Sequence, residues 1–321
     1  MINHSNIYNK IYNILTLFFI VLVLYLPINH ADIFNKDFLQ YVSFKDRILN
    51  EGILKSIVNN TFVFYILFNI LKNISAFNII YGFQILTLIS FFYFFRKINS
   101  RLLLSIILIF FFTVFSNQIR TASALIFAFF FLEFSYKKKW SIAALFALLT
   151  FLTHILPFIV IVLYSFLNMA IYKKKWLIIG SSALIIFILF MLYVNDRFNY
   201  YLQVTNYYSF FGVFSVFILM LLKDYLTQTQ FKNLIFMVGI SILLGYQALL
   251  SSRIVEIIIF IAYVETSTNL SHKIDIKVRN LNIIVLLSFM FFFYRFTVIY
   301  YFAQDGLIFR DYIYNIIKMI I

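Results

Sequence analysis

A few ionisable side chains interrupt stretches of the sequence that are otherwise apolar, and they are the first candidates for chemistry. Arg120 stands in SNQIRTASALIF, His154 in TFLTHILPF, Arg253 in SSRIVEIIIF and Arg295 in FFFYRFTVIY. An ionisable group in an apolar helix is costly, about 2.5–3.5 kcal/mol for Arg on membrane-insertion scales. Each of these residues therefore needs a structural or a functional reason.

The chemistry that these residue types indicate is the binding of a phosphate group with proton transfer beside it. A guanidinium binds two oxygens at once, so Arg120 and Arg253 are predicted to form an anion site, with Arg295 as a further cation. Imidazole titrates near neutrality, so His154 is predicted to act as a general base or as a hydrogen-bond donor to phosphate.

Each candidate also has a simpler explanation, and the sequence leaves both open. Arg120 can extend its guanidinium to lipid headgroups. His154 can be a histidine whose hydrogen bonds are satisfied at a helix end. Arg253 can form a local ion pair with Glu256, three residues further on. In the alternative, Glu256 orients the guanidinium toward an anion.

Polar residues near these positions complete the predicted site. Asn117 and Gln118 directly precede the Ile119–Arg120 pair, and they are predicted to help bind substrate. Asp37 and Tyr41 are four residues apart in NKDFLQYVSF, so on a helix they share one face. Asp37 is the second candidate for a general base, and its simpler explanation is an ordinary solvated carboxylate.

Several patterns are missing from the sequence. It has no cysteine, which excludes disulfides and thiolate metal sites. It also has no GxxxxGK[ST] or GxGxxG phosphate loop, no D-x-D signature, and no HExxH. We therefore expect no metal, no cofactor, and no mechanism driven by ATP or a sugar nucleotide.

The composition predicts the elements that position these residues. Of the 321 residues, 64% are hydrophobic and 12% are charged, whereas soluble domains carry about 25% charged residues. A helix needs about 20 apolar residues to cross a bilayer. The sequence predicts an all-α, polytopic transmembrane bundle of about ten to twelve spans, at residues 11–29, 75–95, 102–117, 119–136, 140–153, 155–171, 176–194, 209–222, 231–247, 251–267 and 281–302.

The basic residues predict how the bundle is oriented. The net charge of +14 falls largely in short clusters between apolar runs, which is typical of membrane topology and argues against nucleic acid as a partner. Because Lys and Arg mark cytoplasmic loops, we expect the N-terminus inside and the C-terminus outside. The predicted cytoplasmic loops are residues 96–101, 137–139, 173–175, 223–232 and 273–279.

One hairpin is predicted more sharply than the rest. The apolar stretch 140–172 lies between two triple-lysine clusters, and it is too long for one span. It must therefore cross twice, with its turn near His154 and Pro157, which places His154 outside. An external loop is predicted at about 30–60 with an amphipathic helix near 38–57, followed by a short re-entrant segment at 61–71. Residues 1–321 are predicted to form a single integral membrane domain.

These features in this order resemble a known family. Asp37 and Tyr41 in an external loop are followed by N-Q-I-R ending at Arg120, by K-K-K and a hairpin with His154, and by S-R-I around Arg253. This pattern is similar to that of the EpsG-type, Wzy-like bacterial polysaccharide polymerases. The resemblance covers about residues 30–267, and its most specific part is 117–165.

The chain departs from the family pattern at two positions. Members often carry an acidic residue where this chain reads N-N-T-F-V-F-Y, with Asn59 or Asn60 in its place. If that acid is catalytic in relatives, its role here passes to Asp37, Glu51 or His154. The Gln that usually follows the family's Arg is Thr121 here.

The resemblance implies a polymerase of O-antigen, capsule or exopolysaccharide repeat units at the outer face of the bacterial cytoplasmic membrane. The implied substrates are oligosaccharides linked to undecaprenyl pyrophosphate; membrane lipids, a chain-length regulator and a flippase are candidate partners. Two alternatives remain: a flippase or transporter of the lipid-linked oligosaccharide, and an external ligase or acyltransferase. Transporters often show paired repeats and helices broken by Gly or Pro, whereas this chain has 7 Gly, 2 Pro and no visible repeat. A ligase would favour a much larger external loop.

Overall fold

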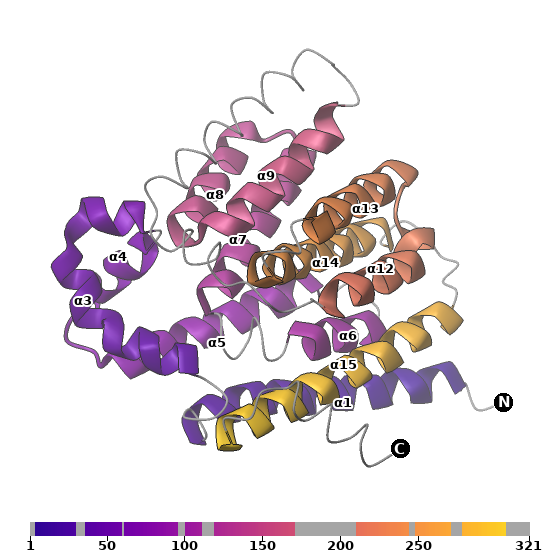
Figure 1. The fold of residues 1–321 in the computed structure, drawn as a ribbon, viewed down its shortest axis with the longest axis horizontal. Helices are drawn as coiled ribbons and strands as arrows, with labels where there is room; N and C mark the ends of the chain where they lie inside the picture. Colours follow the sequence, from indigo (N-terminus) through magenta and orange to yellow (C-terminus); the bar gives the residue numbers. More distant parts are fainter. Residues whose placement is uncertain are drawn as a thin grey trace. The chain divides into compact units, whose positions relative to one another are not determined.

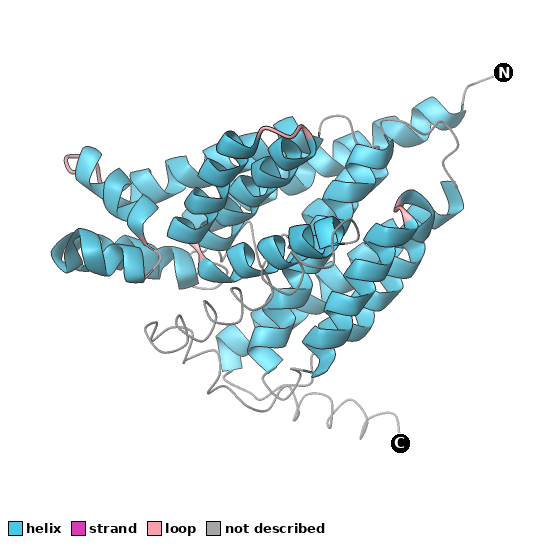
Figure 2. Cartoon of the chain, turned by 90° about the horizontal axis from the view of Figure 1, so that it is seen from above, coloured by secondary structure: helices cyan, strands magenta, loops and turns pink. Residues whose placement is uncertain are grey.

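The computed structural model describes residues 4–29, 36–59, 61–95, 100–110, 119–170, 210–243, 248–270 and 278–305. In these ranges the chain forms twelve α-helices and one short 3-10 helix, with no strand (Figures 1 and 2). The prediction of an all-helical fold is therefore confirmed for this part of the chain. None of the helices in these ranges combines the length and the apolar character required to cross a membrane.

The helices follow the predicted apolar segments closely. The segment at 176–194 lies outside the described residues, as do 111–117 and 244–247 at the ends of two others. The helices are α1 (His4–Asn29), α3 (Lys36–Val58), α4 (Phe62–Ile70), α5 (Ala76–Phe95), α6 (Ser100–Phe110), α7 (Ile119–Tyr136), α8 (Trp140–Thr153), α9 (Ile155–Ala170), α12 (Phe210–Leu222), η2 (Lys223–Tyr225), α13 (Gln228–Leu243), α14 (Ala248–Leu270) and α15 (Val278–Asp305).

The predicted break at His154 is confirmed. His154 adopts an extended backbone (φ −161°, ψ 123°), and its N–H donates to the carbonyl oxygen of Thr150 at 2.8 Å, which closes α8. Pro157 falls in the first turn of α9, where its missing N–H has no helical partner to lose. Helices α8 and α9 pack against each other, so 140–170 is a helical hairpin.

The helices form two compact units. The first contains residues 1–42, 99–119 and 281–321, and the second contains 43–98 and 120–280. In the first unit, α1 packs against α6, and Phe19 lies edge-on to Phe292 with ring centroids 5.0 Å apart. Arg101 is buried there, with its guanidinium 5.2 Å from the centre of the Tyr12 ring. The composition of the sequence does not predict this division.

Helix α14 is the centre of the second unit. Every side chain from Val255 to Thr266 is buried, because α9, α12 and α13 all pack against this helix. A helix buried on all sides carries no amphipathic stripe, so its central position cannot be read from periodicity. Helix α8 packs on α9, and the short α4 packs on α8.

A glycine shapes the corner between α3 and α4. Gly52 has φ 74° and ψ 176°, a combination that is essentially restricted to glycine because a Cβ would strain the backbone. It kinks α3 one and a half turns before its end, and the chain then turns into the nine-residue α4. The predicted helix at 38–57 and the separate short element at 61–71 are both confirmed as helical.

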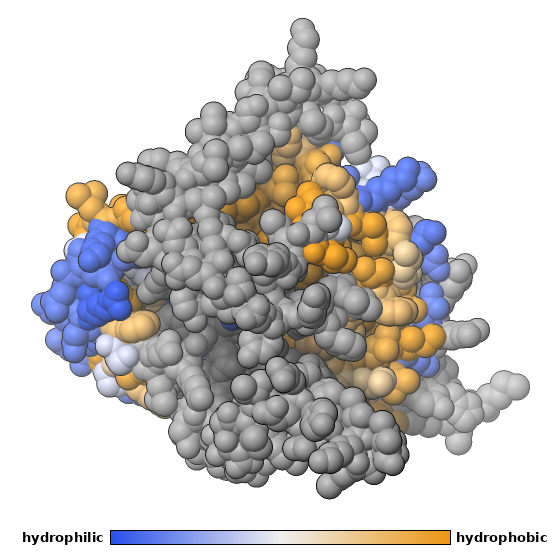
Figure 3. All heavy atoms as spheres, in the orientation of Figure 1, coloured by the Kyte–Doolittle hydropathy of each residue, from blue (hydrophilic) through white to orange (hydrophobic). Residues whose placement is uncertain are grey.

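Large apolar side chains are exposed on several helices of the second unit. Phe217 of α12 and Phe236 of α13 are 60% and 56% exposed, and Leu145 and Leu148 of α8 are also exposed. Figure 3 shows hydrophobic side chains across the face over α12 and α13, and hydrophilic ones at the α3–α4 corner. A continuous exposed apolar surface indicates contact with lipid or with another protein.

Candidate functional site

Three of the predicted site residues lie near the N-terminal ends of helices in the second unit. Arg120 is the second residue of α7, His154 directly precedes α9, and Arg253 is in the second turn of α14. Arg120 and His154 are each only 8% exposed, and the Arg253 side chain is 23% exposed. These three side chains are therefore largely enclosed by protein, although two of them are permanently charged.

The other ends of the same three helices meet at one residue. Tyr136, the last residue of α7, and Tyr164 of α9 both donate their hydroxyl protons to Oε1 of Glu265 in α14; the Tyr164 bond is 2.9 Å. An α-helix rises about 1.5 Å per residue, so each of Arg120, His154 and Arg253 lies roughly 15–24 Å along its helix from the residue of that helix in the Glu265 cluster.

Helix α5 supports the same arrangement of the bundle. The Thr87 hydroxyl lies 3.4 Å from that of Ser123 near the start of α7. One turn further along α5, the ring of Phe91 contacts that of Phe260 near the middle of α14. Taken with the packing of α9 on α14, these contacts indicate that the N-terminal ends of α7, α9 and α14 lie at one end of the unit and Glu265 toward the other.

The imidazole of His154 already accepts one hydrogen bond. Its Nδ1 accepts the N–H of Leu156 at 3.2 Å, as the cap of a helix N-terminus does. In a neutral imidazole one nitrogen accepts and the other donates, so this bond assigns the proton to Nε2. The geometry therefore favours His154 as a helix cap and disfavours the role of general base.

Arg253 and Glu256 form the ion pair that their spacing predicts. Nη1 of Arg253 lies 3.5 Å from Oε2 of Glu256, and the Glu256 side chain is only 5% exposed. This single contact involves only Nη1, so the other N–H groups of the guanidinium can donate to a second acceptor. It agrees with both explanations derived from the sequence, the local pair and the oriented anion-binding group.

Arg120 and Arg253 lie near helix ends that themselves carry positive charge. The N-terminal end of a helix carries roughly half a positive charge, so a nearby cation costs about 0.3–1 kcal/mol. Arg120 is in the first turn of α7 and Arg253 is in the second turn of α14. The same helix ends attract phosphate through their free N–H groups, so an anion there would relieve the repulsion.

The other predicted residues cannot be placed in this cluster. Asn117 and Gln118 lie outside the described residues. Asp37 and Tyr41 belong to α3, and Arg295 belongs to α15, but their side chains lie outside the part of the chain that is described. All three of those helical positions fall in the first unit.

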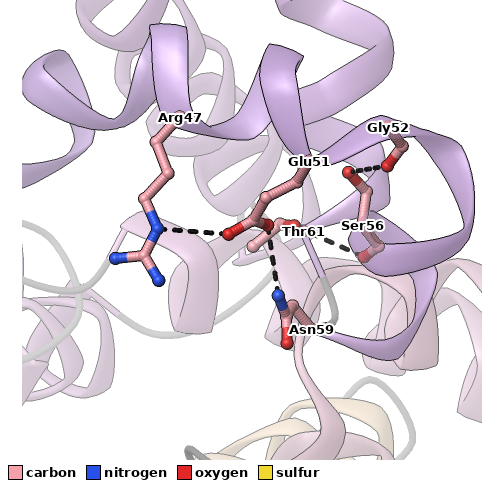
Figure 4. A network of polar contacts seen from close by, with 6 residues as sticks. All are labelled: Arg47, Glu51, Gly52, Ser56, Asn59 and Thr61. Atoms are coloured by element: carbon pink, nitrogen blue, oxygen red, sulfur yellow. Dashed lines mark hydrogen bonds and ion pairs between the residues drawn. The ribbon is translucent and has the colours of Figure 1, made fainter.

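Glu51 is the best-defined acid of the predicted external loop (Figure 4). Its Oε1 accepts from Nε of Arg47 at 3.1 Å, and its Oε2 accepts from Nδ2 of Asn59, also at 3.1 Å. The hydroxyl of Ser56 donates to the carbonyl oxygen of Gly52 at 2.7 Å and steadies the kink. Asn59 thus lies against Glu51, whose side chain is 11% exposed.

The cluster around Glu265 is the main polar feature that sequence reasoning missed. Besides the two tyrosine hydroxyls, the carboxylate accepts from Nε2 of Gln230 in α13. Glu265 is fully buried. An acid inside the predicted span 251–267 is the same kind of signal that identified the arginines, and it could have been found in that way.

The amide of Gln230 is held in one orientation. Its Oε1 accepts from the backbone N–H of Thr227 and from Nδ2 of Asn269, both at 2.9 Å. Nδ2 of Asn269 also donates to the carbonyl oxygen of Tyr225 at 2.9 Å. The Glu265 cluster therefore joins α7, α9, α13 and α14 to the turn at η2.

Within the described ranges, no group of three or more His, Cys, Asp or Glu side chains could hold a metal ion. No family model matches the chain, and neither curated proteins nor solved structures give a significant match.

Proposed function

We propose that this chain is a membrane-embedded polymerase of polysaccharide repeat units. It would transfer the growing glycan from undecaprenyl pyrophosphate to a sugar hydroxyl of an incoming lipid-linked unit at the outer face of the cytoplasmic membrane. One observation carries the proposal: Arg120, His154 and Arg253 lie near the N-terminal ends of three helices whose other ends meet at Glu265. This arrangement suits a substrate that carries concentrated negative charge.

The membrane location rests on composition and on the surface of the helices. The chain is 64% hydrophobic, and large apolar side chains such as Phe217 and Leu145 are more than half exposed.

The predicted orientation is supported by the Glu265 cluster. Tyr136 immediately precedes the lysine turn at 137–139, and Gln230 lies inside the basic loop at 223–232. Two predicted cytoplasmic loops thus adjoin one cluster, away from Arg120 and His154.

The proposed mechanism assigns the cations to the leaving group. As the bond between the anomeric carbon and the pyrophosphate oxygen breaks, negative charge builds on that oxygen. Arg120 and Arg253, fixed in a largely dry setting, stabilise the charge without reorganising. Nε2 of His154 adds a hydrogen bond to the pyrophosphate. The acceptor oxygen forms the new bond to the anomeric carbon, and lipid pyrophosphate departs.

The acceptor hydroxyl must lose its proton to a base within hydrogen-bond reach. Glu51 of the predicted external loop is a candidate for this role, because its hydrogen bonds are defined. Each carboxylate oxygen of Glu51 receives one hydrogen bond, and each retains a further lone pair for the acceptor hydroxyl.

The proposal is tested by single substitutions in the host cell, with the chain length of surface polysaccharide as the readout. Arg120→Ala and Arg253→Ala are expected to abolish long polymer at normal protein levels. Arg253→Lys keeps the charge but not the two-pronged geometry, so it should retain only part of the activity. Lys232→Ala, at the opposite end of the unit, is the matched control and should make normal polymer. Normal polymer from both alanine variants would rule out this site.

His154 needs a variant that separates its two roles. Asn is an effective helix cap, so His154→Asn should preserve the start of α9 while removing the imidazole. We expect normal protein levels and thermal stability with shortened or absent polymer. If the polymer is normal, His154 is only a cap; if the protein is lost, the variant does not reproduce the cap.

A further inference from the structure

Glu265 has an unusual combination of burial and partners. It is fully buried, and within the described part of the chain no Lys or Arg forms an ion pair with it. Its partners are all neutral donors: the hydroxyls of Tyr136 and Tyr164 and the amide of Gln230. A buried carboxylate without a cation is costly, and three donors are what makes it tolerable.

A proton on this carboxyl group would change the number of donors that it can accept. Ionised, Glu265 only accepts, and all three donors point at it. Protonated, it carries a hydrogen of its own and donates, so one of the three existing donors faces a hydrogen instead of a lone pair. A tyrosine hydroxyl can accept this hydrogen if it turns its own hydrogen toward another acceptor, and its bond to Glu265 then no longer involves a charged group.

The three donors differ in their freedom to turn away. Tyr164 is fully buried, and Gln230 is fixed by its bonds to Thr227 and Asn269. Tyr136 is 46% exposed, at the last position of α7, and its hydroxyl can reach solvent or lipid headgroups. Tyr136 is therefore the hydroxyl that can turn its hydrogen away from Glu265 when the carboxyl group is protonated.

We propose that Glu265 is a proton-binding site whose occupancy decides whether the C-terminal end of α7 is held against α14. In the deprotonated state Tyr136 fastens α7 to Glu265. In the protonated state this bond joins two neutral groups and is about half as strong, so the last turn of α7 opens more often. The proposal concerns the end of the unit opposite Arg120 and His154, and it does not depend on polymerase activity.

The titratable groups around Glu265 are few. On α7 they are Tyr136 itself and, one turn away, Glu133, which forms a 2.5 Å ion pair with Lys137. On α9 the group is Tyr164. From η2 and α13, the charged residues of the loop are Lys223, Asp224 and Lys232, all of which are exposed. Two tyrosines therefore contact the carboxylate directly, and the charged groups nearby face solvent.

The absence of cysteine makes a clean test possible. Ser135, next to Tyr136, is buried, so Ser135→Cys places the sole thiol of the full-length protein where it becomes reactive only when the end of α7 opens. Maleimide labelling of the detergent-purified protein is measured with Glu265 intact and with Glu265→Gln, which removes the negative charge and leaves a neutral oxygen facing Tyr136. The thiol's own reactivity toward maleimide also depends on pH. Because this dependence is the same in both proteins, it does not affect the ratio of the two labelling rates.

We expect the Glu265→Gln variant to label about tenfold faster near neutral pH, the effect of losing one charge-assisted hydrogen bond. As the pH is lowered and Glu265 becomes protonated, the two rates should converge. Tyr136→Phe removes only the hydroxyl of a half-exposed side chain and should still fold. Its thiol should be labelled fast, and adding Glu265→Gln to it should not change the labelling rate further. Tyr65→Phe on α4 is the matched control and should label slowly. The proposal would be overturned if Ser135→Cys alone and Ser135→Cys with Tyr136→Phe were labelled at equal rates. It would also be overturned if the ratio of the labelling rates with Glu265→Gln and with Glu265 intact did not change with pH.

Discussion

The Glu265 cluster predicts that one pair of substitutions destabilises the protein separately and compensates when combined. In Glu265→Gln, the new amide keeps an oxygen for the two tyrosine hydroxyls but presents its NH₂ to Nε2 of Gln230. Two donors then face each other. Gln230 cannot flip without losing the N–H of Thr227 and Nδ2 of Asn269. One buried donor is left unsatisfied, which costs about 1–3 kcal/mol.

Adding Gln230→Glu to this variant restores the pattern. The glutamate oxygens accept from Thr227, from Asn269 and from the new amide at 265, so each donor has an acceptor again. Gln230→Glu alone should be worse than Glu265→Gln, because it brings two buried carboxylates together. The expected order of stability is the natural protein, the double variant, Glu265→Gln, and Gln230→Glu.

Stability is measured as the midpoint of unfolding by SDS in mild detergent, followed by loss of helical circular dichroism. Glu133→Gln breaks an exposed ion pair with Lys137 on the same helix, and it serves as the control. Such pairs contribute about 0–1 kcal/mol, so this variant should change the midpoint little. If the losses from Glu265→Gln and Gln230→Glu simply add in the double variant, the hydrogen-bond pattern described for this cluster is incorrect.

Four further predictions follow from single positions. Gly52→Ala should destabilise the α3–α4 corner by about 1–3 kcal/mol through backbone strain alone, because a Cβ there meets nothing within 4 Å; the SDS midpoint measures it. Ser288 donates to the carbonyl oxygen of Ile284, so Ser105 must be the donor in their 2.6 Å bond. Ser105→Ala should therefore cost about 0.5–1.5 kcal/mol, and adding Ser288→Ala should cost less than a second such loss. His154→Asn should keep thermal stability while shortening the polymer. Arg253→Lys should give polymer of intermediate length on a polysaccharide gel.

The positions of the helices were largely predictable because the apolar segments of the sequence are long, continuous and bounded by charged residues. The break at His154 was predicted from two lysine clusters that were expected to lie on the same side of a membrane, and the structure places a helix boundary at that residue. The division into two units was not predictable. It depends on contacts between residues far apart in sequence, such as Tyr12 with Asn282, which no local pattern encodes.

The candidate site was predictable in its residue types and less so in its roles. Arg120, His154 and Arg253 were identifiable because ionisable groups are costly in apolar segments. The role of His154 could not be assigned from sequence, because it depends on which ring nitrogen accepts the N–H of Leu156. Glu265 carries the same signal, but its role could not be assigned from sequence, because only the folded chain brings Tyr136, Tyr164 and Gln230 to it.

The most direct test of the proposed function is to locate the lipid-linked repeat units that accumulate in cells lacking this chain. Loss of a polymerase should leave single repeat units on the lipid at the outer face of the membrane, where an impermeant sugar-specific probe can reach them. The natural chain should restore long polymer, and the Arg253→Ala variant should not. Accumulation of the single units at the inner face would contradict the account, and it would indicate a flippase instead.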